Sequence, residues 1–165
     1  MEPPGFSQSG ESVDGLIVGH NFMRAGEYEL ALKAYRRSIA EQGFTPDVMN
    51  GMGVAHLRLG QVNEAERLLR AAVQADPNFG PAWNNLGVLL AQKQEYLEAK
   101  RAFEIAFGLG EGRSQQIKRN IAKISTALEK NVYTEVNNQS DFELVRRGDG
   151  VYLLIETPSE EQTSR

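Results

Sequence analysis

Hydrophobic and small side chains recur along most of the chain in three segments that share one register. Each segment contains two stretches with the apolar spacing of amphipathic helices. Matching positions in successive segments are 34 residues apart, as the glycine column Gly19, Gly53 and Gly87 shows. The pattern predicts three helix pairs, which we call repeat 1 (12–45), repeat 2 (46–79) and repeat 3 (80–113).

The repeated columns also predict how the helices pack. Small residues allow close approach of a neighbouring helix, while the larger column of Tyr35, Leu69 and Phe103 fills the space between layers. A single helix pair cannot bury its apolar face, so the pairs are expected to stack. The small columns that we assign a structural role are Gly19, Gly53 and Gly87 in the first helices and Ala31, Ala65 and Ala99 in the second helices.

These residues resemble the tetratricopeptide repeat family. Repeat 3 matches best, with Trp83, Leu86, Gly87 and Phe103, and Pro77 closes repeat 2 as the family pattern requires. Repeat 1 departs from the pattern, since Gly15 stands at the tryptophan position. The resemblance implies an all-α superhelix of helical hairpins that acts as a non-catalytic scaffold for protein binding.

The resemblance also implies a concave groove along the first helices, which would take a peptide or protein segment. Asn50 and Asn84 share a column, where stacked amides can bond an extended peptide backbone. Alternatively, these amides only satisfy neighbouring backbone, or the N-terminal lead or C-terminal hairpin covers the groove. The expected groove residues are Val13, Leu16, His20, Met23, Arg24, Asp47, Asn50, Val54, Leu57, Arg58, Asn84, Val88, Ala91, Gln92, Lys118 and Ala122.

Segments outside the repeats complete the expected organisation. Residues 1–11 form a flexible lead, and 114–131 form a capping helix with an apolar stripe. Residues 132–157 form a linker and a small β-hairpin around Gly148-Asp149-Gly150, and 158–165 a disordered tail. The basic face of the capping helix is either solvated or a docking surface for an acidic partner. A second hypothesis is therefore an assembly subunit that docks through its convex face, capping helix and hairpin.

Composition narrows the chemistry. The 165 residues include no cysteine and two histidines, with a formal net charge of -4. These counts exclude disulfides, thiolate zinc sites and thiol catalysis, and they argue against nucleic acid as the main partner. No apolar run is long enough to span a bilayer. We expect no metal site, no cofactor and no enzymatic activity, because no catalytic or phosphate-binding motif occurs.

One branch of the family grips the C-terminal carboxylate of heat-shock chaperones with lysine, arginine and asparagine. The matching positions here are Leu16, His20, Gly51, Pro81 and Asn85. Because these positions lack cations, we expect no heat-shock carboxylate clamp.

The segment from Ile117 to Ile124, followed by Phe142-Glu-Leu-Val-Arg and Gly-Asp-Gly-Val-Tyr-Leu-Leu, is similar to repeat lipoproteins of bacterial tight-adherence (Flp) pilus assembly. That similarity would imply a secretin or another pilus component as partner. Such lipoproteins carry a signal peptide and a lipidated cysteine, and neither is present here. The chain is accordingly periplasmic and outer-membrane-associated if it is a trimmed lipoprotein, and otherwise a cytoplasmic repeat adaptor.

Overall fold

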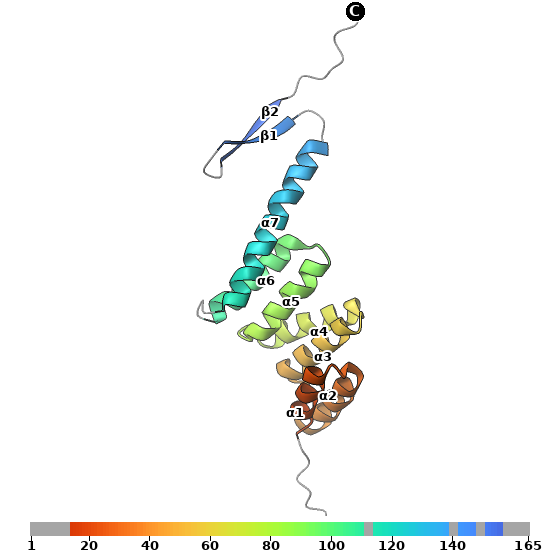
Figure 1. Ribbon diagram of the computed structural model, residues 1–165. Coiled ribbons are helices and arrows are strands. Elements are labelled where there is room, and N and C mark those ends of the chain that lie inside the picture. The colour runs from red at the N-terminus through yellow and green to blue at the C-terminus, as the bar shows by residue number, and fades with distance from the viewer. Residues whose placement is uncertain (1–13, 111–113, 139–141, 148–150, 157–165) are drawn as a thin grey trace, which may run out of the picture.

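The computed structural model describes residues 14–110, 114–138, 142–147 and 151–156, with side chains for 14–110 and 114–131. Three helix pairs stack along one axis, and a seventh helix lies against the last pair (Figure 1). This part of the chain is an all-helical repeat array followed by two short strands. The helices are α1 (Gly15–Ala25), α2 (Tyr28–Gln42), α3 (Pro46–Arg58), α4 (Val62–Ala75), α5 (Gly80–Gln92), α6 (Tyr96–Leu109) and α7 (Gln115–Asn138).

Local side chains and backbone conformations set the helix ends. The Asp14 carboxylate accepts a hydrogen bond from the amide of Leu16 at 2.8 Å and caps α1. Thr45 caps α3 in the same way, with proline at the first helical position. The turns inside repeats 1 and 2 use Gly26 and Gly60 in the left-handed conformation. Repeat 3 places Gln94 in this conformation instead, with φ 64°.

The glycine column lies under the large column of the same repeat. A Cβ atom built on Gly19 would lie 2.4 Å from the Tyr35 ring, and one on Gly87 would lie 2.8 Å from the Phe103 ring. Such distances leave no room for any side chain. Tyr35 also fills the space above Gly51 of α3, and its burial raises the pKa of its hydroxyl to about 12.

Buried side chains form two clusters along the stack. One joins repeat 1 to repeat 2 through residues that include Leu32, Tyr35 and Met52. The other joins repeats 2 and 3 to α7 and includes Leu69, Leu86, Phe103 and Ile124. The core is therefore distributed along the axis rather than gathered at one centre, as stacking of repeats requires.

The seventh helix is longer than the expected capping helix. It continues through residues 132–138, where the sequence predicts a linker. No glycine or proline occurs between residues 114 and 138, so nothing in the sequence stops the helix there. None of the described helices is long and apolar enough to cross a membrane.

Two strands follow α7 and lie near its C-terminal end (Figure 1). β1 (Phe142–Arg147) pairs with β2 (Val151–Glu156) in antiparallel register. The turn 148–150 lies outside the described residues, so the hairpin and its role stay predictions. The expected lead 1–11 and tail 158–165 also lie outside the described part of the chain.

Candidate functional site

A pocket of about 480 Å³ lies between α3 and α5, the first helices of repeats 2 and 3. Two of the repeated columns build it, since Val88 follows Val54 by 34 residues and Gln92 follows Arg58 by the same interval. The two helices therefore present the same stripe side by side. We call this the α3–α5 pocket, and its lining residues are Val54, Leu57, Arg58, Asn85, Val88 and Gln92.

A narrower crevice of about 280 Å³ continues the surface between α5 and α7. It shares Val88 and Gln92 with the α3–α5 pocket, so the two hollows adjoin. Its lining is almost entirely apolar in accessible atoms. We call it the α5–α7 crevice and refer to both hollows together as the groove; the other crevice residues are Ala91, Phe103, Asn120, Lys123 and Ile124.

Three asparagines form a cluster beside the pocket. The Asn85 amide nitrogen donates to the Asn50 side-chain oxygen at 2.8 Å. The Asn84 amide nitrogen donates more weakly to the Asn85 oxygen at 3.5 Å, while the Asn84 oxygen is buried and has no partner among the described residues. Asn50 is only 9% exposed. The amide that lines the pocket is therefore Asn85, and Asn50 and Asn84 lie beside or beneath it.

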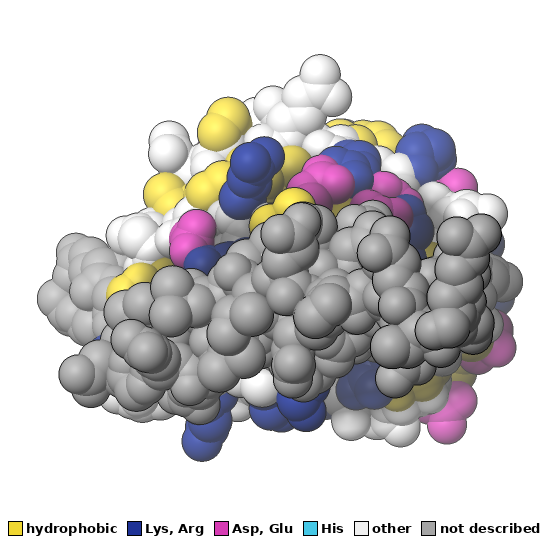
Figure 2. All heavy atoms as spheres, turned by 90° about the horizontal axis from the view of Figure 1, so that it is seen from above, with side chains coloured by type: hydrophobic (Ala, Val, Ile, Leu, Met, Phe, Trp, Pro, Cys, Tyr) yellow, Lys and Arg dark blue, Asp and Glu magenta, His cyan; other side chains and the backbone are white. Residues whose placement is uncertain are grey.

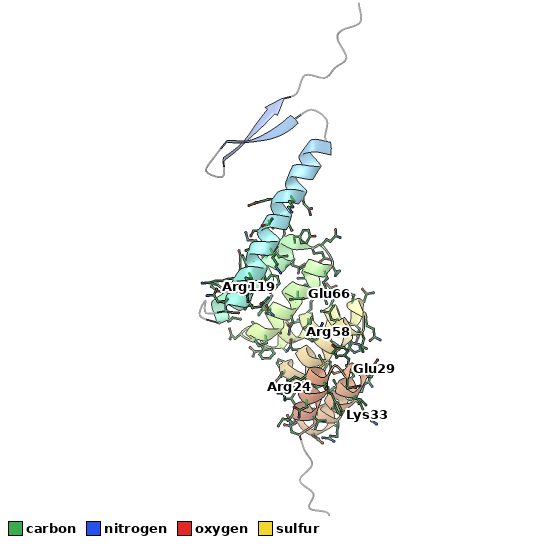
Figure 3. The ribbon with its side chains drawn as sticks, in the orientation of Figure 1. Arg24, Glu29, Lys33, Arg58, Glu66 and Arg119 are labelled. Atoms are coloured by element: carbon green, nitrogen blue, oxygen red, sulfur yellow. The ribbon has the colours of Figure 1, made fainter. Side chains whose placement is uncertain are left out.

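The charged side chains of the groove are cationic. The Arg58 guanidinium lies 5.9 Å from the centroid of the Tyr28 ring, in a cation–π contact. Lys123 is exposed beside the α5–α7 crevice, and no acidic residue lines either hollow. Figure 3 labels Arg58 near the centre of the array. Elsewhere the charges are mixed: seen from the C-terminal end in Figure 2, basic and acidic side chains are interspersed.

The expected groove residues of repeat 1 have other roles. Leu16 and Met23 pack on the first core cluster. The His20 ring meets Tyr35 edge to face, and its Nε2 atom lies 3.6 Å from an Asp47 carboxylate oxygen. Arg24 donates to Asn21 of its own helix. These four side chains do not line either hollow.

The structure also places Lys118 of the capping helix outside both hollows. The Lys118 ammonium group lies 5.5 Å from the Phe107 ring centroid, over α6 and away from the groove. Ile117, Ile121 and Ile124 of α7 pack on the core. Lys118 shares the column of Asn50 and Asn84, neither of which lines a hollow. The structure thus brings Val54, Leu57, Arg58, Val88 and Gln92 together from the expected set, and adds Asn85, Asn120 and Lys123.

A network of ion pairs joins repeats 2 and 3 outside the groove. Glu66 of α4 accepts hydrogen bonds from Lys93 and from Arg70, each at 2.8 Å. Arg70 also reaches Glu98 of α6 at 2.7 Å. Hydrogen bonds from Lys93, and then from Arg70, hold the pKa of Glu66 below its usual range. A second link between these repeats is the bond from the Trp83 indole to the Pro77 carbonyl.

A sequence model described as "Tetratricopeptide repeat" matches residues 19–78 and 50–112. The chain belongs to the tetratricopeptide repeat family. Members of this family are non-catalytic interaction modules, and the helix pairs observed here are their fold. The described residues hold no group of three or more histidine, cysteine, aspartate or glutamate side chains that could bind a metal ion.

Solved tetratricopeptide structures are similar to the chain. The Sgt2 domain from Aspergillus fumigatus is 23% identical, with a TM-score of 0.67, over 91% of this chain and 97% of that one. The second domain of human RPAP3, solved in complex with the HSP70 peptide SGPTIEEVD, is 26% identical, with a TM-score of 0.60. That match covers 68% of this chain and 93% of the RPAP3 domain.

Curated relatives match the array over only part of their own length. The heat-shock cognate co-chaperone sgt12 of Aspergillus fumigatus is 26% identical over 113 residues, which are 68% of this chain and 33% of the relative. The rice SGT1 homolog is 28% identical over 89 residues, which are 54% of this chain and 24% of the relative. The chain thus spans a quarter to a third of these proteins.

These comparisons correct one prediction about partners. We excluded heat-shock peptides because five positions lack cations, but similar domains are solved bound to the HSP70 peptide SGPTIEEVD and to the HSP90 peptide SRMEEVD. That exclusion is wrong. It considered five positions only, of which Asn85 alone lines the groove, whereas the structure places the cations Arg58 and Lys123 at the two hollows. The comparisons give no support to the similarity with pilus lipoproteins.

Proposed function

We propose that the chain is a protein-interaction scaffold whose groove binds an extended, acidic segment of a partner protein. The observation that carries this proposal is the pair of adjoining hollows, which bear Arg58 and Lys123 and no acidic lining residue. The chain as a whole is acidic, with a net charge of -4, so the local cations set this surface apart. An acidic segment would be attracted to this surface by both cations, and no acid lines the hollows to repel it.

Polar groups of the groove suit an extended backbone. Gln92 is exposed on the wall common to both hollows and makes no hydrogen bond with described residues. A glutamine amide offers both donors and an acceptor, as a peptide group requires. Asn85 is held by Asn50, so its side chain is positioned before a ligand arrives. Such preorganisation reduces the entropy that binding costs.

Relatives suggest the first ligands to test. The peptides in the solved complexes, SGPTIEEVD and SRMEEVD, are acidic at their C-terminal ends. Their charge fits a groove that carries Arg58 and Lys123. C-terminal segments of heat-shock proteins are therefore the first class of partner that we would examine, and other acidic segments are the second.

Fluorescence anisotropy tests the proposal with the full chain. The labelled probes are SGPTIEEVD, SRMEEVD and peptides selected on the chain from a 12-residue display library. We expect the selected peptides to be rich in aspartate and glutamate. Their affinity should fall about tenfold or more in Arg58→Glu and in Val88→Glu, since one change reverses a groove charge and the other places a charge on the shared apolar wall.

Arg101→Glu is the matched control, because Arg101 is exposed on α6 outside the groove. Its affinities should equal those of the unchanged chain, and circular dichroism should show that all variants are folded. The proposal is wrong if the library yields no ligand, or if its ligands bind both groove variants as tightly as the unchanged chain. If the selected peptides bind but SGPTIEEVD and SRMEEVD do not, the groove takes an acidic ligand other than these heat-shock segments.

A second candidate function rests on a surface outside the groove. A hollow of about 410 Å³ lies between α6 and α7, and Leu97 beside it is 67% exposed. This feature favours a subunit that docks through α6, α7 and the following strands. In that case partner binding would survive Arg58→Glu and be lost in Leu97→Glu.

A further inference from the structure

α7 packs chiefly on α6, and it contacts α5 less closely than α5 contacts α3. Met52 of α3 and Leu86 of α5 share a column, which continues in α7 as Asn120. A second column runs from Ala55 through Leu89 to Lys123. The four residues of α3 and α5 expose no more than 8% of their surface. At the same two places α7 carries a half-buried amide and an exposed ammonium group.

This exchange leaves a hollow where the earlier helices have core. Phe103 and Ile124 are buried at the α5–α7 crevice, and Val88 and Ala91 of α5 form its apolar wall. The polar groups around it are Gln92, Asn120 and Lys123. An apolar cavity of about 150 Å³ is enough to bind benzene. The crevice, at about 280 Å³, can therefore hold one large apolar side chain.

We propose that the α5–α7 crevice is a specificity subsite, which receives an apolar side chain of the bound segment and pairs a neighbouring acidic side chain with Lys123. The subsite rests on the proposed function, because the segment must lie in the groove to reach it. Lys123 has no acidic partner among the described residues, and no acid lines the crevice. Charge complementarity therefore favours an acidic neighbour over a neutral or basic one.

The spacing of the helices predicts the spacing of the motif. Neighbouring helix axes lie about 8–10 Å apart, and an extended chain advances about 3.3 Å per residue. Because the α3–α5 pocket and the α5–α7 crevice lie on either side of Val88 and Gln92, we infer a separation of about one helix spacing or slightly more. The apolar residue should thus lie about three residues from the acidic residue that faces Arg58.

The test uses the tightest peptide from the 12-residue library and versions in which each residue in turn is replaced by alanine. With the unchanged chain, we expect alanine at one apolar position to weaken binding about tenfold. Asn120→Leu restores the apolar residue that α5 has in this column and fills the crevice, so the variant should be folded and more heat-stable. In Asn120→Leu the same alanine replacement in the peptide should weaken binding by less than about twofold.

A charge exchange tests the second half of the subsite. Lys123→Glu should weaken the peptide severalfold, and lysine in place of the peptide's neighbouring acid should recover affinity in this variant only. Lys33→Glu, exposed on α2 (Figure 3), is the control and should change nothing. The subsite is refuted if every apolar position tolerates alanine within twofold, or if the loss is equal in Asn120→Leu. If only the subsite is refuted, the library peptides should still lose affinity in Arg58→Glu. A failure of the subsite can therefore be distinguished from a failure of the proposed groove.

Discussion

Leu32 and Leu59 lie at the interface between repeats 1 and 2, in the first core cluster. Thirty-four residues later, at the interface between repeats 2 and 3, the same columns hold Glu66 and Lys93, which form an ion pair at 2.8 Å. One interface is therefore held by apolar burial at the place where the next is held by charge. Because burial and ion pairing respond differently to salt and pH, the two interfaces should be separable by experiment.

The two interfaces also differ in where they place bulk. Between repeats 1 and 2 the large Tyr35 meets the small Gly51. In the same columns of the next interface, Leu69 is smaller than Tyr35 and Asn85 is larger than Gly51. The exchange gives α5 an amide that lines the α3–α5 pocket. A groove residue thus arises from the way an interface is packed.

Leu32→Ala should be the most damaging change at the apolar interface. Leu32 is 5% exposed, and removing a buried leucine side chain costs about 2–5 kcal/mol. We expect the free energy of unfolding in urea to fall by about 3 kcal/mol. The loss should be the same at low and at high salt, since no charge is involved. Leu30→Ala, at an exposed position of the same helix, should cost much less. A similar cost for both variants would contradict the account of this interface.

Gly51→Asn gives the interface between repeats 1 and 2 the asparagine that the next interface has at Asn85. Its Cβ atom would lie 2.6 Å from the Tyr35 ring, and overpacking of this kind costs about 1–3 kcal/mol. We expect a loss of about 2 kcal/mol in urea unfolding.

The double variant Gly51→Asn with Tyr35→Leu carries both residues of the second interface and should recover part of that stability. A double-mutant cycle measures the recovery as a coupling free energy. Additive losses from the two changes would show that the exchange of bulk between Tyr35 and Gly51 is not the reason for this pairing.

Glu66→Gln should weaken the ionic interface by a smaller amount. Glu66 is 19% exposed and pairs with Lys93 and Arg70, while surface ion pairs contribute about 0.2–1 kcal/mol each. We expect a loss of up to about 1 kcal/mol at low ionic strength. The loss should largely disappear in about 1 M NaCl, where the screening length is about 3 Å. Glu129→Gln, at an exposed position inside α7, is the control and should have little effect at either salt concentration.

Acid should abolish the difference in stability between the unchanged chain and Glu66→Gln. The pKa of Glu66 is lowered from 4.5 in the folded chain by its hydrogen bonds to Lys93 and Arg70. Its contribution is therefore complete above pH 4.5 and is lost as the pH falls through the lower folded-state value. Stability curves of the unchanged chain and of Glu66→Gln should converge in acid. If they stay parallel below that range, the carboxylate is not the origin of the difference.

The sequence predicted the helices and the repeats well, because helical spacing and a 34-residue register depend on local pattern. Four expected groove residues, Val54, Arg58, Val88 and Gln92, line the α3–α5 pocket, because they occupy columns that the stack brings side by side. Their role in binding a partner stays a prediction. It missed Asn85, whose side chain is set by its bond to Asn50 and by the exchange with the column of Gly51. Column spacing reports which helix face a residue lies on, but not which partner it finds there.

Lys118 of the capping helix is another expected groove residue that lines neither hollow. Continuing the register of the repeats into α7 places it in the column of Asn50 and Asn84. Neither asparagine lines a hollow, and the Lys118 ammonium group lies near the Phe107 ring. The α7 residues that do reach the α5–α7 crevice, Asn120 and Lys123, occupy columns that are buried in α3 and α5, so the pattern of the earlier repeats did not indicate them.

The smallest predicted effect concerns the turn of repeat 3. Gln94 adopts φ 64°, where repeats 1 and 2 have glycine at φ 78° and 75°. A non-glycine side chain in the left-handed region destabilises the folded chain by about 1–2 kcal/mol. Glycine removes this strain, but it raises the entropy of the unfolded chain, which costs about 0.4–1 kcal/mol of stability. Gln94→Gly should therefore stabilise the chain by about 0.5 kcal/mol. Gly60→Gln is the reciprocal control: a Cβ there meets no atom within 4 Å, so backbone strain alone should destabilise it by a similar amount in urea unfolding. If Gln94→Gly raises the free energy of unfolding and Gly60→Gln lowers it, backbone conformation accounts for the difference between the turns. If both variants lower it, Gln94 makes a compensating side-chain contact at the edge of the α6–α7 hollow.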